Sequence, residues 1–225
     1  MVKFLRFVKN YYLCTIISIT MDFQRFNKLN RWTGWGVFAV AALVYLLTIE
    51  PSTSLWDCSE FIATSYKLEV GHPPGAPLFM LLARIATMLA PSTHYVPHMV
   101  NAMNCISSAF CILFLFWTIT LLAKRMIVGK DAEMSLAQSI IILGSGLVGS
   151  LAYTFSDTFW FSAVEAEVYA YSSFLTAIVF WLILKWEEKM RQVTAAQKTF
   201  QEKDSTRVFG SFSATMLSRA LFGNG

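Results

Sequence analysis

The chain has 225 residues, of which 56% are hydrophobic and only 14% are charged, and its formal net charge is +4. Soluble domains carry about 25% charged residues, so the composition indicates an integral membrane protein. The charge is small and no basic stripe alternates with aromatic residues, which excludes a nucleic-acid partner. The four cysteines lack the spacing of a disulfide framework or a zinc site, and we interpret them as structural thiols.

Residues 1–31 form a basic N-terminal segment that we expect on the cytoplasmic side. Its first twenty residues have the basic start and apolar run of a signal peptide, but no small-residue cleavage site follows them. Translation starting at Met21 is the alternative, and we prefer it to a cleaved signal.

Four segments are long and apolar enough to predict membrane-spanning helices, since a span needs about 20 mostly apolar residues. They lie near residues 32–49, 98–123, 137–156 and 168–186. The third is rich in glycine, which favours close helix packing. The sequence therefore predicts an all-α polytopic membrane protein with about four transmembrane helices.

Lys and Arg side chains set the predicted orientation, because they are retained on the cytoplasmic side of short loops. They are frequent before the first span, after the second and after the fourth. By contrast, residues 50–97 contain only Lys67 and Arg84, and residues 154–171 contain neither type. We therefore expect both of these segments on the non-cytoplasmic side.

Within residues 50–97, an apolar stretch near 76–90 is too short to span a bilayer. Pro77 and Pro91 bracket it and Arg84 interrupts it. We expect an interfacial helix there, with Pro77 in its first turn, where proline is favourable.

The motif "WDCSEF" places Asp57 and Glu60 three residues apart, so one helical turn would hold both on one face. Ser54 is expected to cap that turn, and Trp56 and Phe61 to sit at the membrane interface. Burial and mutual repulsion can raise the pKa of one such carboxylate, which could then accept a proton from a hydroxyl group. Spacing alone leaves the alternative of two solvated loop acids open.

The motif "GHPPGAP" predicts a rigid bend, because its two prolines fix φ while Gly71 and Gly75 allow positive φ. The bend carries His72, which could bind a phosphate, act as an acid, or serve as a structural hydrogen-bonding group. Two roles are open for Arg84 as well. It could anchor the helix to lipid headgroups, or it could bind a lipid phosphate.

In the second non-cytoplasmic segment, Glu165 and Tyr169 are four residues apart and are expected on one helix face, with Glu167 pointing elsewhere. Ionisable groups at the mouth of a span are costly unless they face a cavity. His94 and His98 have metal-ligand spacing but no third ligand, so no metal is assigned.

Three blocks in residues 24–188 resemble the domain of unknown function 2723 family: "LWDCSEFIATSYKLEVGHPPGAPLF", "VNAMNCISSAFCILFLFWTIT" and "LAYTFSDTFWFSAVEAEVYAYSSFLTAIVFWLILKWEE". These polytopic, largely bacterial proteins are similar to transmembrane protein 260, a protein O-mannosyltransferase. The resemblance implies a glycosyltransferase of the GT-C fold, which transfers a sugar from a polyprenyl-phosphate donor in the membrane to Ser or Thr of an exported protein. The implied location is the bacterial inner membrane, with the active loops in the periplasm.

The resemblance also implies roles for individual residues. It makes Asp57 and Glu60 the catalytic pair, brings His72 and Arg84 near the lipid phosphate, and lines the same cavity with Glu165, Glu167 and Tyr169. No cofactor is assigned, and the carboxylate pair is compatible with a divalent cation or with none.

Residues 189–225 lose the apolar pattern, whereas family members continue with further spans. We therefore expect a polar cytoplasmic tail from a truncated or aberrant reading frame, and an incomplete enzyme. The alternatives are a transporter or flippase of lipid-linked sugars, whose carboxylates would be coupling groups, and an inactive fragment.

Overall fold

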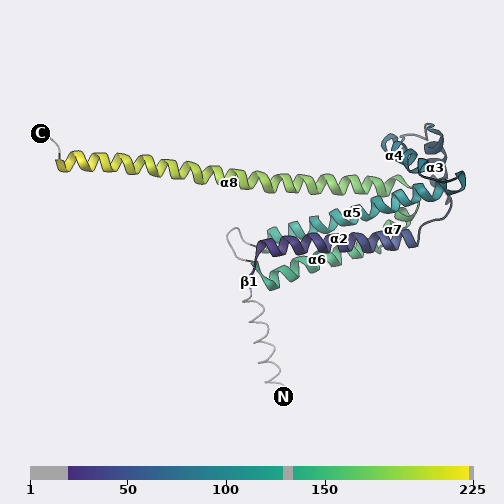
Figure 1. Ribbon diagram of the computed structural model, residues 1–225, viewed down its shortest axis with the longest axis horizontal. Coiled ribbons are helices and arrows are strands. Elements are labelled where there is room, and N and C mark those ends of the chain that lie inside the picture. The colour runs from purple at the N-terminus through teal and green to yellow at the C-terminus, as the bar shows by residue number, and fades with distance from the viewer. Residues whose placement is uncertain (1–19, 129–133, 223–225) are drawn as a thin grey trace, which may run out of the picture. The chain divides into compact units, whose positions relative to one another are not determined.

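The computed structural model describes residues 20–128 and 134–222, and over these ranges the chain is mostly helical (Figure 1). Two short strands, β1 (Thr20–Met21) and β2 (Met134–Ser135), pair antiparallel. The described α-helices are α2 (Phe23–Leu47), α3 (Cys58–Lys67), α4 (Pro77–Met88), α5 (Val96–Ile127), α6 (Leu136–Thr154), α7 (Asp157–Val164) and α8 (Val168–Phe222). The predicted all-α class is confirmed. The choice between a signal peptide and a start at Met21 concerns residues 1–19, which lie outside the described residues.

Two compact units divide the chain, Met1–Trp181 and Leu182–Gly225. The first contains α2 to α7 and the beginning of α8. The second contains the rest of α8, so the predicted polar tail is helical as far as Phe222.

Three helical segments of the described chain are long and apolar enough to cross a membrane: Thr93–Ile127, Leu136–Thr154 and Val168–Lys198. They cover the second, third and fourth predicted spans. The first predicted span lies in α2, which has 25 residues but is not among the three. The physical reason is the polar and aromatic sequence "NRWTGWG" at residues 30–36, which dilutes the apolar run that follows.

The main core lies between α2, α5, α6 and α7, which pack side by side in Figure 1. Glycines allow the close approach of α5 and α6. A Cβ atom on Gly146 would lie 2.6 Å from Thr120 and 2.8 Å from Phe116. The Tyr45 hydroxyl ties α2 to α6 by donating to the Thr154 carbonyl at 3.0 Å.

A second core cluster supports the predicted non-cytoplasmic loop. It joins α3 and α4 to the start of α5 and to residues 166–171. Pro77 begins α4, as the sequence predicts, and Gly75 has a φ of +78°. Because this cluster is buried, the irregular segment 68–76 between α3 and α4 is held at both ends.

Candidate functional site

Asp57 and Glu60 lie at the start of α3. Asp57 is the N-cap residue and Glu60 stands in the first turn, where a negative charge is favourable. The expected capping by Ser54 is wrong, because its hydroxyl instead contacts the Glu165 carboxylate. Both acids remain half exposed, with side chains 48% and 39% accessible. The helix start therefore presents them outward rather than using them as caps.

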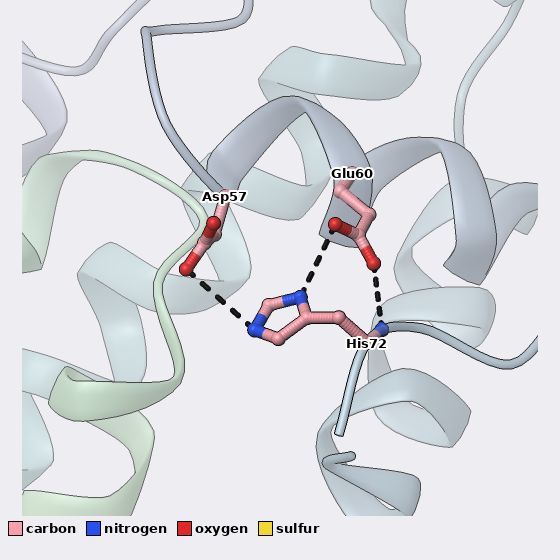
Figure 2. A group of neighbouring side chains, drawn as sticks. All are labelled: Asp57, Glu60 and His72. Atoms are coloured by element: carbon pink, nitrogen blue, oxygen red, sulfur yellow. Dashed lines mark hydrogen bonds and ion pairs between the residues drawn. The ribbon is translucent and has the colours of Figure 1, made fainter. Parts of the chain in front are cut away.

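His72 lies between these two acids (Figure 2). Its backbone N–H donates to Glu60 Oε1 at 2.7 Å, and its ring Nδ1 lies 3.1 Å from Glu60 Oε2. On the other side of the ring, Nε2 lies 3.8 Å from Asp57 Oδ2. A Cβ atom on Gly71 would lie 3.3 Å from Glu60 Oε1, so a larger residue there would require this carboxylate to shift by a few tenths of an ångström.

These contacts change the acidity of Glu60. Hydrogen bonds from the His72 backbone, and then from its ring, hold the pKa of Glu60 below its usual range. Glu60 is thus a carboxylate that accepts hydrogen bonds at neutral pH.

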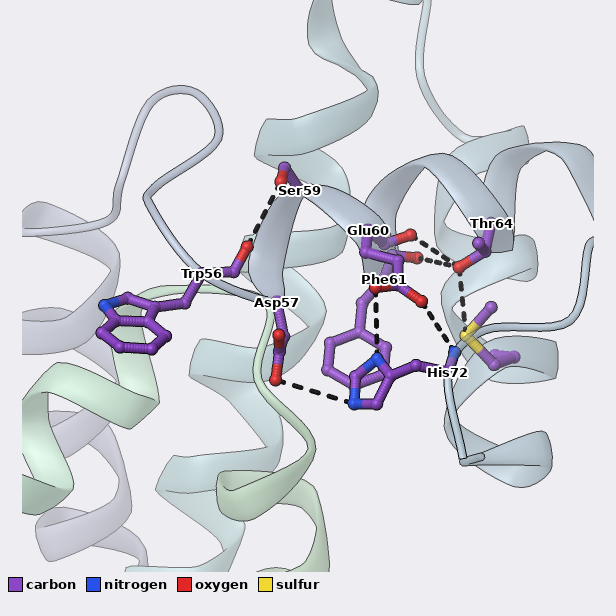
Figure 3. Close-up of polar contacts among 8 residues, drawn as sticks. Trp56, Asp57, Ser59, Glu60, Phe61, Thr64 and His72 are labelled. Carbon is purple, nitrogen blue, oxygen red and sulfur yellow. Dashed lines mark hydrogen bonds and ion pairs between the residues drawn. The ribbon is translucent and has the colours of Figure 1, made fainter. Parts of the chain in front are cut away.

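Neighbouring residues hold the backbone of Glu60, and the Ser59 hydroxyl donates to the Trp56 carbonyl at 3.3 Å (Figure 3). The Thr64 hydroxyl donates to the Glu60 backbone carbonyl at 2.6 Å. The Trp56 indole points away from the Glu60–His72 contact and is 86% exposed. Phe61 was expected at the membrane interface as well, but it is buried against the His72 and Phe79 rings.

Asp57 and His72 open onto a cavity of about 410 Å³ between α3, α4 and α8. Aromatic and aliphatic side chains make up much of its wall. The lining residues are Asp57, Phe61, His72, Pro74, Gly75, Ala76, Pro77, Leu78, Phe79, Val168, Tyr169, Tyr171, Ser172 and Leu175. A largely apolar cavity with a few polar groups in its wall is typical of a ligand site.

Glu165 and Glu167 lie in the connection between α7 and α8, so the expected shared helix face of Glu165 and Tyr169 is wrong. The chain leaves the helix because the Glu165 carbonyl accepts from the Asn104 side chain and, at 2.8 Å, from the Glu167 backbone N–H. Tyr169 lines the cavity, whereas neither glutamate does.

Glu167 is 8% exposed, and its Oε2 atom has no hydrogen-bond partner. Burial, with added repulsion from Glu165 and Asp57, raises the pKa of Glu167 to about 7, although His72 acts in the opposite direction. The charges of Asp57 and His72 therefore both act on the Glu167 carboxyl group.

Arg84 is not brought to the cavity. Its guanidinium donates to the Tyr66 carbonyl and lies 5.6 Å from the centre of the Tyr66 ring. Among the residues that line the cavity there is neither Lys nor Arg.

Two buried asparagines on α5 were missed by the sequence reasoning. Asn101 donates to the carbonyls of Glu50 and Ser52 at 2.8 and 3.0 Å, and Asn104 donates to those of Ser162 and Glu165. They hold the loop before Asp57 and the α7–α8 connection. Their signal was available, since two amides in an apolar helix are costly in a membrane unless they bind something.

The arrangement suits proton transfer more directly than ion binding. One atom each from Asp57, Glu60 and His72 lies within 4.8 Å of the others, a spacing that a cation could bridge. However, both Glu60 oxygens already accept hydrogen bonds from His72, and a bridging ion would have to break the ring contact.

Residues 57–217 match the model of the family described as "Protein O-mannosyl-transferase TMEM260 N-terminal domain". The chain belongs to this family. The resemblance noted in the sequence is thereby confirmed, and the matched range includes Asp57, Glu60, His72 and Glu167 and continues beyond residue 188.

Two curated relatives are similar over much of the chain. "Protein O-mannosyl-transferase TMEM260" of Mus musculus is 29% identical over 177 residues, which are 79% of this chain and 22% of that protein. "Protein O-mannosyl-transferase tmem260" of Dictyostelium discoideum is 25% identical over 156 residues, which are 69% of this chain and 17% of that protein. The chain spans about a fifth of the length of these TMEM260 relatives. No solved structure matches it.

The apolar helices and the TMEM260 relationship together identify an integral membrane protein.

Proposed function

We propose that the chain forms the donor-side part of a membrane glycosyltransferase that transfers mannose from a polyprenyl-phosphate donor to Ser or Thr of an exported protein. The observation that carries this proposal is the largely apolar cavity whose lining includes Asp57 and His72. Two TMEM260 relatives with protein O-mannosyl-transferase in their names support the reaction class.

The cavity wall suits a lipid-linked donor. Phe61, Phe79 and Leu175 would contact the isoprenoid chain near its phosphate, because apolar surface is removed from water there. Asp57 and His72 would then lie beside the sugar and the phosphate.

Asp57 is the general base in this proposal. It would accept the proton of the acceptor hydroxyl as the acceptor oxygen attacks the anomeric carbon of the sugar and the bond to the donor phosphate breaks. The carboxylate is half exposed, so an acceptor side chain can reach it from outside the cavity.

The distribution of Lys and Arg supports an orientation in which this site faces away from the cytoplasm. In a bacterial inner membrane the cavity would open to the periplasm, where exported acceptor proteins pass. The N-terminal segment would remain cytoplasmic.

The test is a radiolabelled mannose transfer assay with polyprenyl-phosphate mannose, in membranes that contain the protein expressed from its complete reading frame. Asp57→Asn should reduce transfer by about 10²-fold or more, the usual contribution of a positioned base. Asp157→Asn is the matched control, since Asp157 is exposed, begins α7 and does not line the cavity. Equal transfer by the two variants would contradict the assignment.

A further inference from the structure

The contacts of Glu60 determine which nitrogen of His72 carries a proton. An ionised carboxylate can only accept hydrogen bonds, so Nδ1 of His72 must be the donor in its 3.1 Å contact with Glu60. The second Glu60 oxygen holds the backbone of the same residue at 2.7 Å. Ring and backbone are thus fixed together, and the free nitrogen of the ring is Nε2.

Nε2 is the ring nitrogen on the side of Asp57. It lies 3.8 Å from Asp57 Oδ2, and both residues line the cavity wall. A shift of less than 1 Å would bring the two atoms to hydrogen-bond distance, which is about 2.7–3.2 Å. A proton received by Asp57 therefore has a short route to His72.

We propose that His72 Nε2 delivers the acceptor's proton to the departing lipid phosphate, and that Glu60 is the positioning residue that orients the His72 ring for this step. This inference rests on the proposed function, and it changes the expected role of Glu60 from partner of Asp57 to partner of His72.

The proton balance closes without a further reactant. The acceptor O–H proton passes to Asp57 while the acceptor oxygen bonds to the anomeric carbon and the anomeric carbon–phosphate oxygen bond breaks. His72 starts the step as an imidazolium, with protons on both Nδ1 and Nε2. The released lipid phosphate gains one negative charge and takes the proton from His72 Nε2. Asp57 then returns its proton to Nε2, so both residues regain their starting states and the net proton ends on the lipid phosphate.

His72 is the cavity residue suited to meet the phosphate. Among the described residues that line the cavity there is no Lys or Arg, and Arg84 is engaged with Tyr66. A phosphate close to Asp57 would be repelled by the negative charge of that carboxylate unless a protonated imidazole lay beside it.

The titratable groups around the His72 ring come from three parts of the chain. Asp57 and Glu60 face it from the start of α3, and Glu167 acts on it from the α7–α8 connection. Tyr169 and Tyr171 line the same cavity from α8.

The first test measures the ring directly by ¹⁵N NMR of the chain in detergent micelles. Neutral His72 should carry its proton on Nδ1, whereas free imidazole side chains favour Nε2. Glu60→Ala should shift His72 to the Nε2–H form and leave His94 and His98, the other two histidines of the chain, unchanged. A neutral His72 with its proton on Nε2 in the unsubstituted protein would overturn the proposed orientation.

The second test measures transfer as a function of pH in membranes containing the protein from its complete reading frame. His72→Gln should lower the maximal rate by about 10²-fold, the low end for a general acid, and should abolish the fall in rate on the alkaline side. Glu60→Gln should keep that fall but lower the rate less, and His94→Gln, an exposed residue away from the cavity, should match the unsubstituted protein.

The outcomes separate the two proposals. If the unsubstituted protein transfers no sugar, the proposed function fails. If it transfers sugar but His72→Gln keeps an unaltered pH profile, the proton route through His72 is wrong. Loss of transfer with EDTA and recovery with Mn²⁺ would also overturn that route, because a metal ion would then neutralise the charge of the phosphate in place of the imidazolium.

Discussion

The side-chain amide of Asn104 on α5 donates a hydrogen bond to the backbone carbonyl of Ser162 at 2.9 Å. The same amide contacts the Glu165 carbonyl, so one buried side chain holds the end of α7 and the connection that follows it. Asn101, one turn earlier, holds the loop before Asp57 in the same way. A single helix thereby positions both acidic loops of the candidate site.

Asn104→Leu should destabilise the protein by about 1–3 kcal/mol, because it removes the amide donor from the Ser162 carbonyl and leaves the Glu165 carbonyl with only the Glu167 N–H. Reversible unfolding in mixed detergent micelles would measure the loss. Ser108→Ala is the control. The buried Ser108 hydroxyl donates to the backbone carbonyl of Asn104, in its own helix, at 2.8 Å. If both variants unfold at the same detergent ratio, the amide does not hold the connection.

Much of the fold could be predicted because it depends on local patterns. Apolar runs identified the three candidate spans, and proline at residue 77 identified the start of α4. The spacing of Asp57 and Glu60 correctly indicated a helical turn. Predictions of this kind need only a few neighbouring residues.

The site itself depends on contacts between distant residues, and the sequence did not reveal these. The contact between Glu60 and His72 is made across the irregular segment 68–71, whose path no periodicity describes. Ser54 was expected to cap α3, but its hydroxyl donates to the carboxylate of Glu165, which is 111 residues away in the sequence. The break between α7 and α8 is likewise stabilised by Asn104 from another helix, so a local pattern could not predict it.

Gly146→Ala should destabilise the contact between α5 and α6. The added methyl group would overlap Thr120 and Phe116, and overpacking of this kind costs about 1–3 kcal/mol. Gly144→Ala, on the same helix, is the control because its methyl group would meet nothing within 4 Å. Thermal unfolding in detergent should lower the Tm of the Gly146 variant alone. Equal Tm values would mean that the two helices separate enough to admit the methyl group.

Glu167 should make stability depend on pH. Its pKa in the folded protein is raised to about 7 by burial and by repulsion from Glu165 and Asp57. The folded state therefore keeps a proton that the unfolded state loses near pH 4.5, and stability falls as pH rises between pH 4.5 and 7. Glu167→Gln removes this loss, so its Tm should exceed that of the unsubstituted protein by on the order of 10 °C at pH 8 and equal it below the ordinary pKa of Glu.

Glu69→Gln serves as the control for this pH experiment. Glu69 is exposed and lies 3.9 Å from Lys67, whereas Glu167 is buried. The Tm of the Glu69→Gln variant should equal that of the unsubstituted protein both at pH 8 and below the ordinary pKa of Glu. A Glu167→Gln variant that behaves like Glu69→Gln would show that Glu167 is hydrated in the folded protein.

Filling the cavity should prevent donor binding without unfolding the protein. Ser172 lines the cavity from the first turns of α8 and is itself exposed, so a larger side chain there can occupy the cavity without entering the core. Ser172→Trp should weaken binding of polyprenyl-phosphate mannose by about tenfold or more, which corresponds to at least 1.4 kcal/mol. Photo-crosslinking of a diazirine-labelled donor, at several donor concentrations, would measure this. Val179→Trp is the control, because Val179 is exposed on the same helix but does not line the cavity. Crosslinking that falls equally in both variants, or in neither, would mean that the donor does not occupy this cavity.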